Sequence, residues 1–91
     1  MPYIKTEQRE KYGNSIGILT SNLQNNGKDG IPIVGDVNYV ISKLLWNIFD
    51  CNPSYTLGNN LIGVLECVKQ EMYRRKLAPY EDQKIKENGD I

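Results

Sequence analysis

The 91-residue sequence contains no histidine. This absence excludes the Ser-His-Asp and Cys-His arrangements of nucleophilic catalysis and the HExxH motif of zinc proteases. It also removes the side chain that most often acts as a general base near neutral pH. Glu66 and Glu71 do not form a carboxylate pair on one face, because five residues turn a helix by about 140°. We therefore expect a protein that is not an enzyme.

Cysteine is also scarce, since Cys51 and Cys67 are the only two. Two thiols are too few for a disulfide scaffold or, without histidine, for a structural zinc site. We expect both to be reduced, and we expect neither a metal nor a cofactor. No apolar run approaches the roughly 18 residues of a membrane span, and charged residues follow Tyr3 too closely to allow the apolar region of a signal peptide. These absences predict a cytoplasmic protein.

The sequence has no excess charge of either sign, because 11 basic residues balance 11 acidic ones. A protein that binds nucleic acid without sequence preference usually carries an excess of Lys and Arg, which neutralise phosphates. Zero net charge therefore disfavours nucleic acid as the partner. A chain of 91 residues allows one domain with a small core, and self-association is a common way to stabilise such a domain.

Apolar residues at helical spacing predict an all-α fold of three or four helices. We expect them at residues 6–12 and 14–25, 36–50, 54–77 and 79–88, with Asp36 capping the second. Pro79 fits either the first turn of a fourth helix or a kink in a long third one. The helices at 36–50 and 54–77 are expected to form an antiparallel hairpin. The strongest apolar stripe comprises Val37, Val40, Ile41, Leu44 and Ile48.

Two groups of residues are candidates for an interface. Residues 27–35 contain three glycines and a proline, which predicts a loop, yet Ile31 and Ile33 within it are apolar. Tyr39, Lys43 and Trp46 lie at i, i+4 and i+7, away from the main stripe of their helix. These three side chains either pack within the domain or between subunits, or stack on a ligand. Aromatic residues of this kind are good interface anchors in either case.

A second cluster is basic and aromatic. It comprises Tyr73, Arg74, Arg75 and Lys76, with Tyr80 nearby. Such residues can bind a phosphate, a nucleotide, nucleic acid or an acidic protein surface. The alternative is a solvated helix end whose charge is balanced by neighbouring acidic residues. Of all the residues in the sequence, this cluster is the best candidate for binding an anion.

Several short motifs give the sequence a resemblance to other proteins. They are MPYIK at residues 1–5, GDVNYVI at 35–41, GVLECV at 63–68 followed by YRR at 73–75, APYED at 78–82 and NGD at 88–90. With these motifs the sequence resembles a family of short uncharacterised proteins of bacteriophage and bacterial genomes. The resemblance implies a phage or mobile-element setting, in which small proteins often block a host protein or sequester a host signal.

Three hypotheses follow. The first is a homo-oligomeric accessory protein that binds a host or phage protein stoichiometrically. The second is a sequestering protein for a nucleotide or another phosphate-containing signal, of an anti-defence type, which would use the cluster at residues 73–80. The third is an accessory protein that binds nucleic acid. If the chain is phage-encoded, its place of action is the cytoplasm of the host cell.

Overall fold

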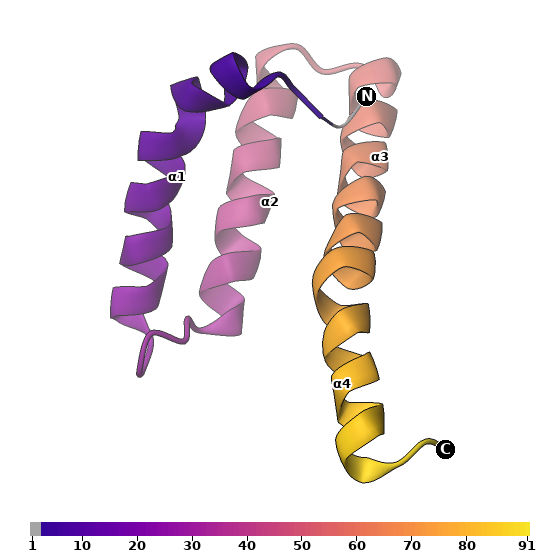
Figure 1. Cartoon of the computed structure of the whole chain (residues 1–91). Coiled ribbons are helices and arrows are strands. Elements are labelled where there is room, and N and C mark those ends of the chain that lie inside the picture. Colours follow the sequence, from indigo (N-terminus) through magenta and orange to yellow (C-terminus); the bar gives the residue numbers. More distant parts are fainter. Residues whose placement is uncertain (1–2) are drawn as a thin grey trace. The chain divides into compact units, whose positions relative to one another are not determined.

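The computed structural model describes residues 3–91, so the first two residues of the 1–5 motif lie outside it. The described chain is all-α, as predicted, and contains no strand. No helix within it combines the length and the apolarity needed to cross a bilayer. The elements are α1 (Thr6–Asn26), α2 (Val34–Cys51), α3 (Tyr55–Met72), the π-helical turn η1 (Tyr73–Leu77) and α4 (Ala78–Asn88) (Figure 1).

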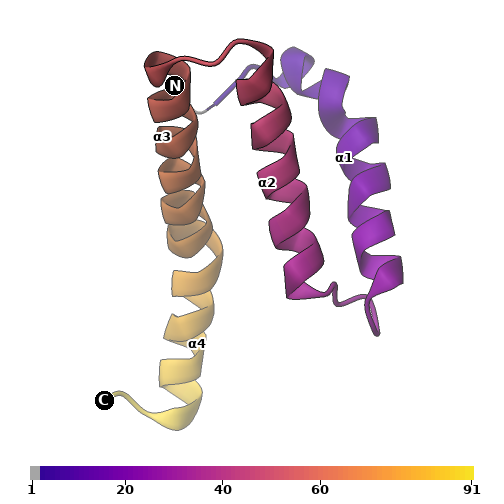
Figure 2. The same cartoon turned by 180° about the vertical axis from the view of Figure 1, so that it is seen from behind.

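The chain divides into two compact units, Met1–Pro53 and Ser54–Ile91. The first unit is a hairpin of α1 and α2, which run side by side and antiparallel in both views (Figures 1 and 2). The second unit is a single helical rod of α3, η1 and α4. The hairpin expected between residues 36–50 and 54–77 involves one helix of each unit and stays a prediction.

Helix α1 is continuous, and the expected interruption near residue 13 is wrong. A glycine in a helix costs up to about 1 kcal/mol, whereas a break leaves orphan backbone groups at two new helix ends. No neighbouring atom crowds Gly13 or Gly17, so both fit the helix without a steric conflict. Thr6 is the first helical residue, and the side chain of Gln8 accepts a hydrogen bond from the amide of Lys5 at 3.2 Å.

The connection between α1 and α2 is a tight turn. Lys28 and Ile31 exchange two backbone hydrogen bonds of 3.0 and 2.9 Å, and the two residues between them, Asp29 and Gly30, have φ of 56° and 76°. Positive φ at both central positions is the signature of a type I′ turn, for which Asp-Gly is a preferred pair. A side chain at Gly27 would overlap the carbonyl of Ile31. The predicted loop is therefore an ordered reverse turn.

Helix α2 begins at Val34, two residues before the expected start, with Ile33 at the N-cap. Asp36 therefore does not cap the helix. It lies in the first turn, where a carboxylate interacts favourably with the helix dipole, and it accepts a 2.7 Å hydrogen bond from Asn26 at the end of α1. This contact joins the two helices at the closed end of the hairpin.

The rod of the second unit begins at Ser54, whose hydroxyl accepts a 3.0 Å hydrogen bond from the amide of Leu57. The backbone remains helical from α3 through η1 into α4, and the amide of Ala78 donates to the carbonyl of Tyr73, five residues back. Pro79 lies in the first turn of α4. The residues after Pro79 thus continue the rod as a helix that ends at Gly89.

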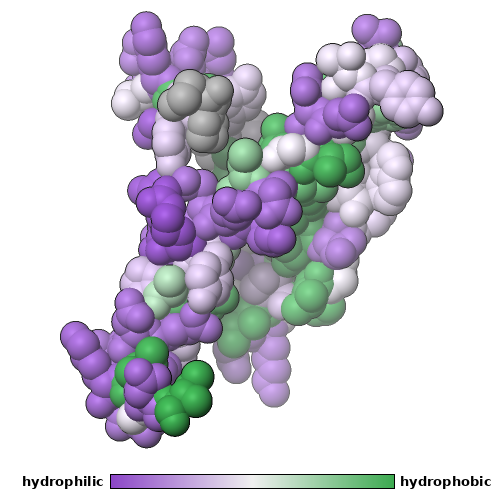
Figure 3. All heavy atoms as spheres, turned by 90° about the vertical axis from the view of Figure 1, so that its right-hand side faces the viewer, coloured by the Kyte–Doolittle hydropathy of each residue, from purple (hydrophilic) through white to green (hydrophobic). Residues whose placement is uncertain are grey.

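No side chain within residues 3–91 is fully buried. Of the stripe predicted in α2, only Val37 and Val40 are half-buried, and its other three members are exposed. Leu45 and Phe49 are half-buried instead. Hydrophobic side chains are visible at the surface in the space-filling view, where they are green (Figure 3). Neither unit by itself encloses a buried core among its described residues.

Candidate functional site

The aromatic group predicted in α2 occupies one face of the helix. Tyr39 and Trp46 are 64% and 59% exposed, and Lys43 is exposed between them. Asp36 lies three residues before Tyr39 and Asp50 lies four residues after Trp46, so all five side chains lie on one face of the helix. We call this set the α2 aromatic face. It combines two large aromatic side chains with charges of both signs.

Tyr39 also lines an open groove of about 420 Å³ between α1 and α2. Asn26 and Asp36, which are hydrogen-bonded to each other, both line it. Leu19, Asn22, Leu23 and Val40 line the remainder. The groove lies within the first unit, and the α2 aromatic face forms one of its edges.

The two apolar residues of the turn are both exposed. Ile31 is 69% exposed and Ile33 is 53% exposed. Ile31 is held by its two backbone hydrogen bonds with Lys28, so its side chain is presented on an ordered backbone. An exposed apolar side chain in an ordered turn loses little backbone entropy on binding.

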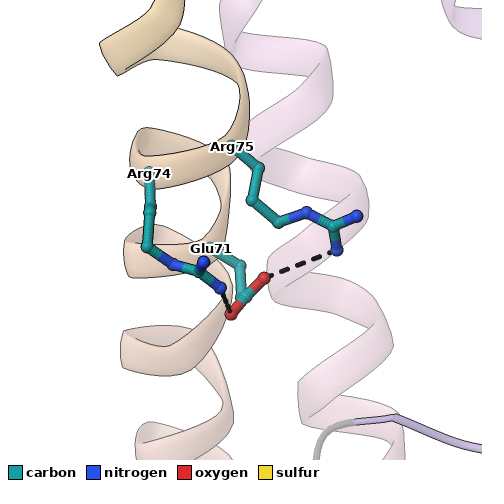
Figure 4. Close-up of polar contacts among 3 residues, drawn as sticks. All are labelled: Glu71, Arg74 and Arg75. Atoms are coloured by element: carbon teal, nitrogen blue, oxygen red, sulfur yellow. Dashed lines mark hydrogen bonds and ion pairs between the residues drawn. The ribbon is translucent and has the colours of Figure 1, made fainter.

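The structure does not gather the basic cluster into one pocket. Arg74 donates to one carboxylate oxygen of Glu71, and Arg75 lies 3.6 Å from the other, so both guanidinium groups are directed at the same carboxylate (Figure 4). Glu71 is partly covered, with 29% of its side chain exposed. The two arginines are thus neutralised in part before any ligand arrives.

The two tyrosines of the cluster face different directions. Tyr73 donates a 2.8 Å hydrogen bond to Glu81, which raises the pKa of its phenol above the ordinary value of 10.0. The ring of Tyr80 lies 5.5 Å from the Lys84 ammonium in a cation–π contact. Across η1, ideal helix geometry separates the two rings by about 120° around the axis. They do not converge on one ligand.

An open hollow of about 540 Å³ lies beside Tyr73 on the rod. Its lining includes two carboxylates, Glu66 and Glu71. The pKa of Glu66 is lowered by hydrogen bonds from Gln70 and then Lys69, which keeps its carboxylate charged. Residues 66–90 contain six acidic and six basic side chains. The hollow therefore has no excess positive charge with which to hold a phosphate.

Three features of the structure are missing from the sequence-based expectations. The first is the π turn itself, which shifts the register between the apolar residues of α3 and Tyr80. The second is that residues 51–65 carry no charge, a property that can be read directly from the sequence. The third is that α2 exposes apolar side chains on two sides, with Leu44 at 57% and Trp46 at 59%.

No group of three or more Cys, Asp or Glu side chains capable of holding a metal ion occurs among residues 3–91. Both cysteines are exposed free thiols. The family model for a domain of unknown function, DUF6899, matches residues 1–91, so the chain belongs to that family. Among curated proteins and among solved structures, none matches the chain.

Proposed function

We propose that this member of a family of unknown function acts by stoichiometric binding to another protein, and that it does so as a homo-oligomer. In a phage or mobile-element setting the partner is a host or phage protein and the site of action is the host cytoplasm. The α2 aromatic face, with Ile31 and Ile33 of the turn, is the surface assigned to the partner. No catalytic step is part of the proposal.

The observation that carries the proposal is the exposure of large aromatic and apolar side chains within the first unit. Tyr39 and Trp46 on α2 are 64% and 59% exposed, and Ile31 of the turn is 69% exposed. Aromatic side chains of this kind are enriched among the residues that contribute most to protein–protein binding.

The distribution of apolar side chains supports more than one contact surface. On α1, Ile16 and Ile18 are 61% and 56% exposed, although two residues turn a helix by about 200°. Leu44 and Trp46 repeat this arrangement on α2. Packing against a single neighbour buries only one stripe of a helix, so each of these helices retains a second apolar side. Such surplus faces are typical of proteins that function in a complex.

The phosphate-binding alternative has weaker support. Arg74 and Arg75 pair with Glu71, and Tyr73 pairs with Glu81, so binding an anion there requires breaking existing contacts. Nucleic acid is disfavoured for the same reason and by the zero net charge. A panel of linear and cyclic nucleotides tests the alternative, because a ligand at 100 times its Kd adds about 2.7 kcal/mol to stability. A clear shift in Tm with one nucleotide would favour sequestration over protein binding.

The main test is partner binding with a matched pair of variants. The tagged wild-type protein is used to isolate a partner from host lysate, and the purified partner is then titrated calorimetrically. Trp46→Ala should weaken that binding by roughly 30-fold or more, the loss expected for an interface anchor worth at least 2 kcal/mol. Leu44→Ala is the control, because Leu44 is equally exposed on the other side of α2.

Two results would contradict the proposal. If no protein binds with a defined stoichiometry, the proposed function is wrong. If a partner binds equally well to Trp46→Ala and to the wild type, the protein-binding function stands and the α2 aromatic face is the wrong surface. Unchanged far-ultraviolet circular dichroism of both variants shows that helix content is retained.

A further inference from the structure

An apolar stripe runs along α3 in the second unit. Val64, Leu65, Val68 and Met72 are 50%, 37%, 58% and 61% exposed. With 100° per residue, all four lie within an arc of about 100° around the helix. The half-buried Leu57 extends this arc toward the start of the helix. We call these residues the α3 stripe.

The π turn continues the α3 stripe onto α4. In an unbroken α-helix, Tyr80 would be about 120° away from Val68, because twelve residues separate them. The π turn contains one residue more than the α-turn it replaces, which reduces this angle to about 20°. Tyr80, 58% exposed, therefore falls in line with the stripe. The sequence thus maintains a single apolar line across two helices.

Nothing within the second unit can cover this line, because α3, η1 and α4 form one rod (Figures 1 and 2). Isolated helices are marginally stable in water, and most helices in proteins are stabilised by packing of their apolar face. The charge pattern marks the same region. Residues 51–65 have no charged side chain, and depletion of charge characterises the core of protein interfaces.

We propose that a second copy of this chain docks on the α3 stripe in antiparallel orientation, around a two-fold axis near Val68. This inference rests on the homo-oligomer of the proposed function and assigns the surface that forms it. A two-fold axis requires a self-complementary surface. The stripe meets this requirement because its two ends lie at equal distances from Val68. Leu57 lies eleven residues before Val68. Tyr80 lies twelve residues after it, or eleven when the extra residue of η1 is not counted.

The charges determine the orientation. Charged residues are confined to the C-terminal part of the rod, beginning with Glu66. A parallel pair would place Glu66 beside Glu66 and Arg74 beside Arg74, and such like-charge contacts are unfavourable. An antiparallel pair places the charged half of one helix along the uncharged half of the other. Residues 54–91 carry six acidic and six basic side chains, so two copies do not repel each other through net charge.

The α2 aromatic face belongs to the first unit and is not used in this contact. Dimerisation and partner binding can therefore be tested with separate variants.

The first experiment measures oligomeric state by light scattering coupled to gel filtration. Val68→Asp should convert a wild-type dimer to monomer and weaken association by at least roughly 100-fold, because two unpaired carboxylates would be buried at the axis. Ile62→Asp is the matched control. Ile62 is 67% exposed on the same helix and points about 120° away from Val68, so this variant should remain dimeric.

The second experiment determines the orientation and does not depend on a destabilising substitution. In a Cys51→Ser, Cys67→Ser background, Val64→Cys combined with Met72→Cys should form an intermolecular disulfide on mild oxidation, and Val64→Cys alone should not. An antiparallel pair brings residue 64 of one copy opposite residue 72 of the other. Efficient cross-linking of Val64→Cys alone would show a parallel pair and overturn the orientation.

The remaining outcomes separate the two proposals. If the wild type is a monomer, both this inference and the homo-oligomer of the proposed function are wrong. A wild-type oligomer that persists in Val68→Asp overturns this inference alone. If Val68→Asp unfolds, the cross-linking result decides. Partner binding retained by a monomeric Val68→Asp would show that dimerisation is independent of the α2 aromatic face.

Discussion

The π turn η1 allows a sharp prediction, because a π turn is an α-turn with one residue added. Deleting Lys76 should convert Tyr73–Leu77 to α-helix while keeping the residues on either side in register. Inserting one alanine after Lys76 should instead rotate α4 relative to α3. The two variants change the chain by one residue in opposite directions. Deletion should keep the contact between Tyr73 and Glu81, whereas insertion should break it.

The magnitude follows from helix geometry. Tyr73 and Glu81 are eight residues apart, which in an ideal α-helix places them about 80° apart. The extra residue of η1 reduces the angle to about 20°, which is why the 2.8 Å hydrogen bond forms. After deletion of Lys76 the two are seven residues apart in a plain α-helix, again about 20°. After insertion the angle returns to about 80°, and the phenol and carboxylate separate.

The pKa of Tyr73 reports this geometry. Glu81 accepts a hydrogen bond from the Tyr73 phenol and carries a negative charge beside it, so the pKa of Tyr73 is raised above 10.0. A carbon-13 titration of the tyrosine ring carbons should show a raised pKa in the wild type and in the deletion variant. The pKa should return to about 10.0, the ordinary value of a tyrosine, in the insertion variant. Tyr73→Phe identifies the resonance.

The sign of the stability effect follows from the raised pKa. A folded-state pKa above the unfolded value means that the contribution of Tyr73 is fully present below pH 10 and is lost as the pH rises through the folded-state pKa. The insertion variant should lack this alkaline loss, whereas the deletion variant should retain it. A Tyr73 pKa that is ordinary after deletion and raised after insertion would refute the assignment of η1 as one extra residue.

Three further predictions concern local structure. Ser54→Ala should lower the stability of the second unit by about 1 kcal/mol through loss of the N-cap, and Ser54→Asp should restore it, as measured by urea unfolding. Gly27→Ala should destabilise the hairpin of α1 and α2, because its methyl group would overlap a backbone carbonyl. Gly35→Ala should be tolerated, because its methyl group would meet no atom within 4 Å. Thermal melting of the two variants tests this difference. Gln70→Ala should raise the lowered pKa of Glu66 toward 4.5, since the largest stabilising hydrogen bond is removed. The contribution of the Glu66 carboxylate to stability is present above pH 4.5 and is lost as the pH falls through its lowered pKa. A Glu66 titration that Gln70→Ala leaves unchanged would count against this contact.

Helix boundaries were the most predictable part of the fold. The Ser54 cap and the Asn25-Asn26-Gly27 end of α1 follow from local preferences that act within one turn. The break expected at Gly13 failed because a glycine penalty is smaller than the cost of two additional helix ends. Helix α2 starts earlier than expected because the type I′ turn is complete at Ile31, which allows the helix to begin directly after Ile33. That turn depends on Asp29 and Gly30 adopting positive φ together.

The candidate site was predictable as a list of residues and not as an arrangement. Tyr39 and Trp46 are exposed on one face of α2, and their role in an interface stays a prediction. The basic cluster was read as one anion site because its members are close in sequence. The π turn changes the angle between Tyr73 and Tyr80, and Glu71 pairs with both arginines. Neither effect follows from the order of residues alone, because a π turn has no simple sequence signature.

The sequence by itself determined the all-α content, the Ser54 cap of α3 and the lack of histidine, because these depend on local backbone preference and on composition. The tertiary structure decided which apolar side chains remain uncovered. Periodicity places Ile41 and Leu44 on one face of α2, but it does not state what lies against that face. Leu45 and Phe49 are half-buried while Ile41 and Leu44 are exposed, since burial depends on neighbouring elements in space and not on the helix that carries the residue.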